Sequence, residues 1–412
     1  MSGDLDHLFR RESGRIVATL TRIFGMHNLT LAEDVVQEAF CRALEVWKFG
    51  GVPQNPSAWL TVTARNCALD ALRRQRTADS LAPQLSYALE SAAAEELFGP
   101  AEARDDLLRM MFSCCHPRLS ETAQIALILH ILCGFSVDEV ASAFLQGSAA
   151  MEKRITRAKK VLADSRRLFD VTAPREFVTR LPVVQSALYL LFNEGYHGAS
   201  ADAAVHAELC AEAMRLTATL LEHPFGATPT SYALAALMCL NAARLPARLD
   251  TAGDLHALPE QDRARWDQRR IADGFRFLEL SAHGTELSPY HIEAAIAALH
   301  ARAPSAAGTD WPQIVALYDT LIAVRPSPIV ALNRAIAIAQ SEGPERGLAE
   351  IDQIVGHERL RGYPFHSAAL GELELRCGRR ELAGAHFRAA LSLARNPTEQ
   401  RFITQRISAC EQ

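Results

Sequence analysis

The chain has 412 residues, of which 49% are hydrophobic and 22% are charged, and this composition is typical of a soluble globular protein with two or three domains. Its formal net charge of −5 excludes a protein that coats nucleic acid through bulk charge, so any contact with DNA requires a local basic patch. Nine scattered cysteines without a C-x-x-C pair, no apolar signal core and no run of 18 apolar residues together predict a cytoplasmic protein with buried, reduced thiols and no membrane contact.

Nearly all apolar patterns along the chain repeat with the period of a helix, and no convincing series of alternating strands occurs. We therefore predict an all-α fold. Weak periodicity with Pro and Ser content marks a linker, and Pro174 interrupts the pattern after a basic helix end. The predicted parts are a small helical domain at 1–78, a linker at 79–103, a second small helical domain at 104–170 and a larger helical region at 171–412.

The first informative segment, 31–47, is predicted to be a helix with two faces. Its apolar face has a residue at every fourth position: Leu31, Val35, Ala39, Ala43 and Trp47. Its polar face holds Asp34, Gln37, Glu38 and Arg42. Such a polar face is either solvated or a binding surface, and the residues alone leave both interpretations open.

A second helix is predicted from Pro56, because a first helical turn tolerates the missing N–H of proline. Its inward stripe is Leu60, Ala64, Cys67 and Ala71, and its outer face holds Asn66, Asp70, Arg73 and Arg74. Trp59 is either a core residue or an aromatic surface on which an unpaired base stacks.

A helix-turn-helix pattern follows at 136–162. Ser136 and Glu139 have the spacing of a capping box, so a helix is expected from Val137, and its inward residues are Val137, Val140, Ala141 and Phe144. After a turn at 145–147, Ser148 is expected to cap a second helix. The inward stripe of this second helix is Met151, Ile155, Ala158 and Leu162, and its opposite side carries Lys153, Arg157 and Lys160.

The second helix of this pattern is basic. Between Ser148 and Arg167 there are seven cations against Glu152 and Asp164, a net charge of 7 − 2 = +5. The cations are Lys153, Arg154, Arg157, Lys159, Lys160, Arg166 and Arg167. In a helix-turn-helix the N-terminal part of such a helix reads base edges and the later cations bind phosphates, whereas the other interpretation is a solvated basic helix.

Together these segments resemble the sigma-70 superfamily, and specifically an extracytoplasmic-function (ECF) type RNA polymerase sigma factor. The segment at 32–40 is similar to region 2.2, which binds the core polymerase, and implies that role for Asp34, Gln37 and Glu38. The segment at 55–74 is similar to regions 2.3 and 2.4, which open and read the −10 element. This resemblance implies −10 contacts by Trp59, Arg65, Asn66, Asp70, Arg73 and Arg74.

The segment at 135–160 resembles region 4.2 of the same family, which reads the −35 element with its second helix. The residues implied in −35 binding are Ser148, Glu152, Lys153, Arg154, Arg157 and Lys160. The resemblance also implies that core RNA polymerase and promoter DNA are the partners of this chain.

The rest of the chain is similar to a subgroup with a fused C-terminal helical domain that is thought to regulate the factor and has a tetratricopeptide-like part. The segments at 188–200 and 261–267 look like signatures of this subgroup. Near the end, seven residues fall at the offsets of a tetratricopeptide unit: Leu370, Gly371, Gly378, Ala383, Phe387, Ala390 and Leu391. An irregular helical bundle is the alternative. The resemblance implies an intramolecular contact of the C-terminal domain with the sigma domains.

Other functions are also compatible with single features. Glu194, His197 and His206 are residue types found in metal and acid–base sites, but no further ligand lies at a suitable spacing, so we predict no enzyme, no metal and no cofactor. Two alternatives act without core polymerase: a helix-turn-helix transcriptional regulator and a tetratricopeptide scaffold.

Overall fold

The computed structural model describes residues 2–75, 100–144, 146–164, 169, 173–197, 205–250 and 253–411. Across these residues the regular structure is helical, apart from one isolated bridge between Leu249 and Leu255. The predicted all-α fold is therefore confirmed. None of the helices among the described residues is both long enough and apolar enough to cross a membrane.

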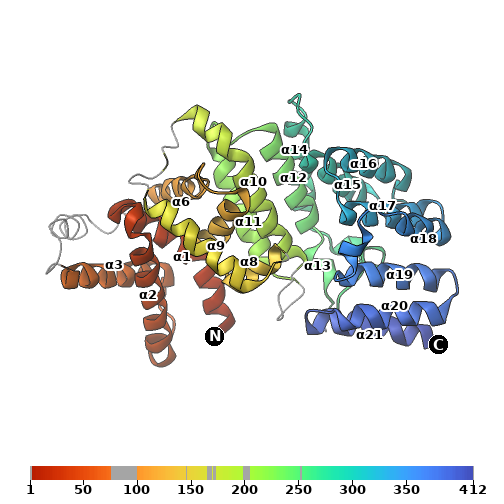
Figure 1. Ribbon diagram of the computed structural model, residues 1–412, viewed down its shortest axis with the longest axis horizontal. Coiled ribbons are helices and arrows are strands. Elements are labelled where there is room, and N and C mark those ends of the chain that lie inside the picture. Colours follow the sequence, from red (N-terminus) through yellow and green to blue (C-terminus); the bar gives the residue numbers. More distant parts are fainter. Residues whose placement is uncertain are drawn as a thin grey trace. The chain divides into compact units, whose positions relative to one another are not determined.

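The chain forms two compact units (Figure 1). The first consists of residues 1–191 with 222–226, and the second consists of 192–221 with 227–412. The division falls inside helix α10 (Pro174–His197), later in the chain than the predicted boundary at residue 170.

The first unit begins with four helical elements: α1 (Ser2–Phe24), the 3₁₀ turn η1 (Met26–Asn28), α2 (Leu29–Gly50) and α3 (Pro56–Gln75). Helices α1, α2 and α3 pack on one another, and Leu20, Val36 and Leu60 of these helices are buried. Trp47 of α2 meets Trp59 of α3 edge to face, with ring centroids 5.3 Å apart. Burial of these stripes holds α3 at a fixed position across α2.

The second part of the first unit supplies the helix-turn-helix. Its elements are α6 (Pro100–Cys114), α7 (Glu121–Leu127), the π-helical turn η2 (Ile128–Leu132), α8 (Val137–Ala143) and α9 (Ser148–Ala163), followed by the start of α10. Helix α6 begins at Pro100, so the last residues of the predicted linker at 79–103 are helical, while 76–99 lie outside the described residues. The preceding elements α7 and η2 support the helix-turn-helix with four buried side chains: Ile125, Ile128, Leu129 and Leu132.

The second unit is a succession of helices joined by short connections. Most of these helices have a proline in their first turn. Its longer helices are α11 (Ala207–Glu222, the last residue assigned to the first unit), α12 (Pro229–Ala242), α14 (Gln268–Ser281), α15 (Pro289–Arg302), α16 (Trp311–Val324), α17 (Pro328–Ser341), α18 (Pro344–Asp352), α19 (Pro364–Arg376), α20 (Arg380–Ser392) and α21 (Pro397–Glu411). Its short elements are α13 (Leu245–Arg248), η3 (Leu258–Glu260), η4 (Arg263–Arg265) and η5 (His357–Leu360).

Helices α19, α20 and α21 are stacked one beside the next in the blue part of Figure 1. The first pair fits closely because Gly371 of α19 lies against the buried ring of Phe387 of α20. Gly378 supplies the turn between them with a φ of +78°, a conformation that glycine adopts without strain. Ala383 and Ala390 are buried on the same face of α20 as Phe387. The small residues that the sequence singled out therefore pack this helix pair.

We expect Gly371→Ala to destabilise the second unit by about 1–3 kcal/mol, because an added Cβ would lie 2.9 Å from the Phe387 ring in a packed core. The matched control is Gly384→Ala on α20, whose Cβ would meet only the end of Arg388, at 3.4 Å, and which gains helix propensity. Thermal unfolding followed by circular dichroism measures both variants. Equal melting temperatures for the two variants would contradict this packing.

Candidate nucleic-acid and polymerase interfaces

Helix α2 presents the polar face that the sequence predicts. Asp34 and Gln37 are exposed, and Glu38 is half-buried and accepts a hydrogen bond from Arg42 at 2.5 Å. The apolar stripe faces inward, since Val35, Ala39, Ala43 and Trp47 are buried, while Leu31 is only half-buried. The polar face is therefore available to a partner on the side of α2 away from the core.

The last turns of α2 carry an exposed apolar surface that the sequence analysis missed. Leu44 is 54% exposed, Val46 is 52% exposed and Phe49 is 88% exposed. Large apolar side chains gathered on one exposed helix end are typical of a surface that docks another macromolecule. The signal was present in the sequence, because these three residues lie off the inward stripe that repeats at every fourth position.

The inward and outer residues of helix α3 largely follow the predicted pattern. Leu60, Ala64 and Cys67 are buried, whereas Ala71 is half-buried. The outer residues Asn66 and Asp70 are exposed, and Arg65 is half-buried. Trp59 is itself half-buried and packs on Trp47, so its ring belongs partly to the core and keeps an accessible part. The side chains of Arg73 and Arg74 lie outside the described residues.

The first helix of the helix-turn-helix, α8, begins with the capping box that the sequence predicts. The backbone N–H of Glu139 donates to Ser136 Oγ at 3.2 Å, and the backbone N–H of Ser136 donates to Glu139 Oε2 at 2.8 Å. Val140 and Ala141 are buried, and Val137 and Phe144 are half-buried.

The start of the second helix, α9, corrects one prediction. Gly147 occupies the N-cap position and Ser148 is already the first helical residue, so Ser148 does not cap the helix. The reason is that the extended backbone ends at Gly147, with φ −76° and ψ 141°, one residue earlier than expected. The inward stripe is confirmed, since Met151, Ile155, Ala158 and Leu162 are all buried.

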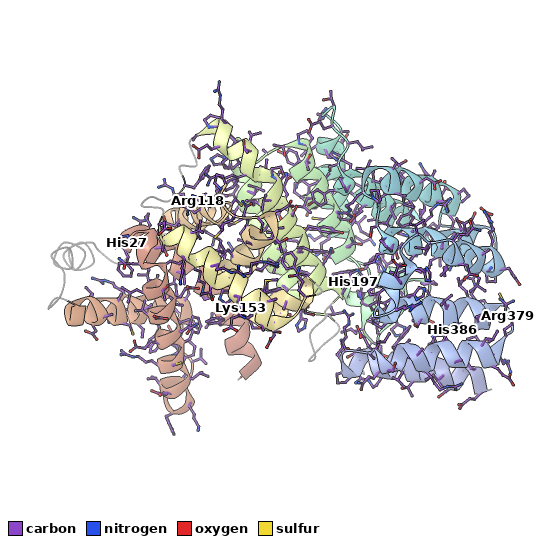
Figure 2. The ribbon with its side chains drawn as sticks, viewed as in Figure 1. His27, Arg118, Lys153, His197, Arg379 and His386 are labelled. Atoms are coloured by element: carbon purple, nitrogen blue, oxygen red, sulfur yellow. The ribbon has the colours of Figure 1, made fainter. Side chains whose placement is uncertain are left out.

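Among the described residues, the exposed surface of α9 carries fewer cations than the seven counted along the sequence. Lys159 is withdrawn from it, because its Nζ pairs with Glu33 of α2 at 2.7 Å. Arg154 is half-buried and donates to Gln146 at 2.5 Å, and Arg166 and Arg167 lie outside the described residues. The exposed surface of α9 carries Ser148, Glu152, Lys153, Arg157 and Lys160. Figure 2 marks Lys153 on this helix.

The two small helical modules of the first unit touch through a contact that we call the module interface. Among the described residues, three ion pairs cross it: Lys159–Glu33 at 2.7 Å, Arg10–Glu139 at 2.6 Å and Arg22–Asp106 at 2.7 Å. Arg10 also lies over the ring of Phe135, 5.6 Å from its centroid. Gly14 allows α1 to approach η2 closely, because a Cβ there would lie 2.2 Å from the carbonyl oxygen of Leu132.

A cavity of about 280 Å³ remains at this interface, lined by residues of both modules. Its lining includes Arg10, Glu33, Gln37, His130 and Phe135. Gln37, which the sequence assigns to the polymerase-binding face, therefore also borders the second module. Gln37 therefore belongs both to the polar face of α2 and to the module interface.

The acid–base and metal interpretation of the C-terminal half gains nothing from the geometry. His206 Nδ1 lies 3.0 Å from Glu208 Oε1, while Glu194 is buried. Over the residues that the structure describes, no group of three or more potential metal-binding side chains occurs.

Comparisons with known proteins agree with the two modules. The model of Sigma-70 region 2 matches residues 8–78, and the model of Sigma-70 region 4 matches residues 109–162. A family of unknown function (DUF6596) matches residues 180–282. The chain is 40% identical over 395 residues to Uncharacterized protein R00370 from Rhizobium meliloti (strain 1021), which covers 95% of this chain and 92% of that protein. No solved structure matches the chain.

A helix-turn-helix that presents cations opposite a buried stripe, preceded by a second helical module, defines a DNA-binding transcription protein. The chain belongs to the sigma-70 family, and it shares nearly its whole length with the Rhizobium relative. Core RNA polymerase and promoter DNA are the partners that these domains imply.

We expect the Arg10–Glu139 pair to stabilise the module interface at neutral pH and to fail in acid. Burial raises the pKa of Glu139, but the hydrogen bonds from Arg10 and Ser136 and the positive charge of Arg10 outweigh burial and hold the pKa below its usual value. The stabilisation is therefore complete above the ordinary pKa of 4.5 and is lost as the pH falls through the lowered pKa of the folded protein.

Glu139→Gln should accordingly lower the stability of the first unit by about 1–2 kcal/mol at neutral pH and have no effect once the native carboxylate is protonated. Thermal unfolding of both proteins across a pH series measures this difference. Glu152→Gln on the exposed face of α9 is the control and should leave the melting temperature unchanged. A cost that does not vary with pH would refute the role of the Glu139 charge.

Proposed function

We propose that the protein is an RNA polymerase sigma factor of the ECF type that directs promoter-specific transcription initiation and is modulated by its C-terminal half. The observation that carries the proposal is the set of surfaces on the first unit. An acidic and apolar face on α2 precedes an amide- and aromatic-bearing helix α3 and a basic recognition helix α9. A repressor needs only the last surface, whereas a subunit that brings polymerase to opened DNA needs all three.

In this proposal α2 binds core polymerase. Asp34, Gln37 and Glu38 provide the polar contacts, and Leu44, Val46 and Phe49 provide apolar area at the adjoining helix end. The exposure of these apolar side chains supports the assignment, because each Å² of apolar surface that a partner buries stabilises the complex by about 25 cal/mol.

Helix α3 reads the −10 element. A base that leaves the duplex needs an aromatic face and amide groups, and the accessible part of Trp59 together with Asn66 provides both. Arg65, Arg73 and Arg74 bind the strand backbone, and Asp70 accepts hydrogen bonds from exposed base amino groups.

Helix α9 lies in the major groove at −35. Ser148, Glu152 and Lys153 lie in the N-terminal part of the helix, where base edges are read, and Arg154, Arg157 and Lys160 follow on the phosphate side. The burial of Met151, Ile155, Ala158 and Leu162 supports this orientation, because it turns the basic side away from the core.

The module interface must open for both DNA elements to be bound at once. The −10 and −35 elements are separated by about 25 base pairs, or about 85 Å at about 3.4 Å per pair. A compact unit of about 190 residues has a radius of gyration of about 16 Å. We therefore propose that core polymerase separates the two modules by outcompeting the ion pairs of the module interface.

The C-terminal half is proposed as the regulatory part, with a tetratricopeptide-like arrangement in its last helices. The packed pair of α19 and α20 around Gly371 and Phe387 supports that part of the proposal. The functional boundaries at 1–78, 104–170 and 171–412 belong to the same proposal.

The experiment that tests this function is multiple-round transcription by core polymerase on a pool of genomic fragments, with and without the full-length protein. New transcripts with defined start sites support the proposal. Duplex DNA binding without core polymerase, combined with no new transcript, would identify a helix-turn-helix regulator. Neither DNA binding nor transcription would identify a scaffold.

Replacing Lys153, Arg157 and Lys160 together with Ala should weaken promoter binding of the holoenzyme and flatten its salt dependence. Each lost phosphate contact reduces the slope of log K against log salt by about 0.9, so the two phosphate contacts of Arg157 and Lys160 remove about 1.8, while the loss of Lys153 removes a base contact. The matched control removes three exposed arginines from the second unit: Arg269, Arg361 and Arg388. A slope that is the same in both triple variants would show that α9 does not contact phosphates.

Asp34→Ala combined with Glu38→Ala should weaken binding to core polymerase about tenfold or more, because the polymerase loses polar partners at the edge of its contact. Fluorescence anisotropy of labelled protein titrated with core polymerase gives the dissociation constants. The control pair, Glu121→Ala with Glu176→Ala, removes the same charge from other exposed sites of the first unit. Equal losses in both pairs would make the effect one of net charge and not of α2.

A further inference from the structure

Three arginines of the second unit gather around two aromatic rings, and we call this group the arginine cluster. The guanidinium of Arg248 lies 4.1 Å from the centroid of Tyr196, and that of Arg244 lies 5.8 Å from the same centroid. Arg244 is also 5.7 Å from the centroid of Trp266, and Arg263 is 4.8 Å from that centroid. Tyr196 comes from the end of α10, Arg244 caps the start of α13 and Arg248 ends it, and Arg263 and Trp266 come from η4 and the residue that follows it.

The positive charges of the arginine cluster have no acidic counterpart within the described part of the chain. No ion pair joins a carboxylate to Arg244, Arg248 or Arg263 there. Arg263 donates instead to the backbone oxygens of His300 and Ala303, and Arg244 donates to the side-chain oxygen of Gln261 at 3.2 Å. Desolvation by burial lowers the pKa of Arg244, and although Tyr196 opposes this, the charges of Arg248 and Arg263 lower the pKa further.

Arg248 is the least satisfied member of the arginine cluster. Only 8% of its surface is exposed, and its Nε finds no hydrogen-bond partner. Three neighbouring polar atoms are in the same condition: Tyr196 Oη, Trp266 Nε1 and His300 Nδ1 belong to residues that are 3%, 3% and 8% exposed, and none has a partner. Burial together with Arg244 and Arg263 lowers the pKa of His300 to about 3, so this imidazole is neutral.

A buried charge and buried donors without partners are both costly, and folded proteins nearly always pair them. The faces of Tyr196 and Trp266 offset part of the arginine charge through cation–π contacts but provide no hydrogen-bond acceptor in the plane of the guanidinium. The missing chemical partner is therefore a compact group with negative charge and several acceptor oxygens. A phosphate group has this chemistry and matches the planar donor geometry of arginine.

We propose that the arginine cluster is a binding site for a small phosphate-bearing ligand, which makes the second unit a receptor as well as a helical scaffold. Arg248 and Arg244 hold the phosphate oxygens, and Tyr196 Oη and Trp266 Nε1 donate to oxygens that the arginines leave free. Arg244 and Arg263 are only half-buried, so the cluster keeps an edge toward the surface of the unit. Burial is the main cause that lowers the pKa of His197, which is next to Tyr196 and is marked in Figure 2, and the charges of Arg248 and Arg244 lie close enough to lower it further.

Two observations along the chain support this assignment independently of the proposed sigma function. The segments 188–200 and 261–267, singled out in the sequence, lie far apart in the chain yet deliver Tyr196, Arg263 and Trp266 to one place. Five of the six residues of the site fall within 180–282, the part matched by the family of unknown function, and His300 alone lies beyond it.

Isothermal titration calorimetry and thermal unfolding of the full-length protein test the proposal with two probes, inorganic phosphate and phenyl phosphate, against sodium chloride at equal ionic strength. We expect saturable binding and a rise in melting temperature that follows ligand concentration. A stronger effect of phenyl phosphate identifies a phosphate ester as the ligand, and a stronger effect of inorganic phosphate identifies the free anion.

Arg248→Met keeps an unbranched apolar stem and removes the guanidinium charge, so it should weaken binding of the stronger probe at least tenfold. The control Arg276→Met removes an exposed arginine that pairs with Asp273 and should bind as the native protein does. If Arg248→Met does not fold, Tyr196→Phe, which removes a single unpartnered hydroxyl, should still weaken binding. No saturable effect of either probe, or equal binding by the native protein and the variant that folds, would overturn the proposal.

Discussion

The pairing of Lys159 with Glu33 is the contact on which the closed form of the first unit depends, because it joins helix α9, which we propose reads DNA, to helix α2, which we propose binds polymerase. The pair is largely shielded, with side-chain exposures of 23% and 14%, so it is screened less by salt than a surface pair. Together with Arg10–Glu139 and Arg22–Asp106 it closes the two modules on each other. Each such pair contributes only about 1 kcal/mol or a few. This is small against the binding free energy that a protein interface of ordinary size provides, so a large partner is able to open the unit.

Much of this unit could be predicted from the sequence because its helices have one buried stripe each. Periodicity alone placed Val35, Ala39 and Trp47 of α2 and the four buried residues of α9, and the Ser136–Glu139 spacing identified a capping box. The prediction that Ser148 caps α9 was wrong, because Gly147 and Ser148 are adjacent and only the backbone conformation decides which of them ends the turn. The loss of Lys159 from the basic patch was beyond prediction, since its partner lies 126 positions away in the chain.

In the second unit the sequence predicted individual residues better than their arrangement. Gly371, Gly378, Ala383 and Phe387 were recognised from their spacing, and they do pack one helix pair. The arginine cluster is different, because Tyr196, Arg248 and Trp266 come from separate helices and turns and meet only in the folded unit. Charges that lack a partner within the described residues are visible only once the structure shows what surrounds them, and they are the basis of the ligand site that we propose in the second unit.

The most direct test of the account is the distance between the two modules, measured by double electron–electron resonance with spin-labelled unnatural amino acids at Gln54 and Thr156, both exposed. Labels on unnatural residues avoid the nine cysteines of the chain. We predict a short, narrow distance distribution in the free protein and a long one once core polymerase and promoter DNA are added. A short distance that persists in a complex that produces transcripts would contradict the account, because the closed unit cannot reach both promoter elements.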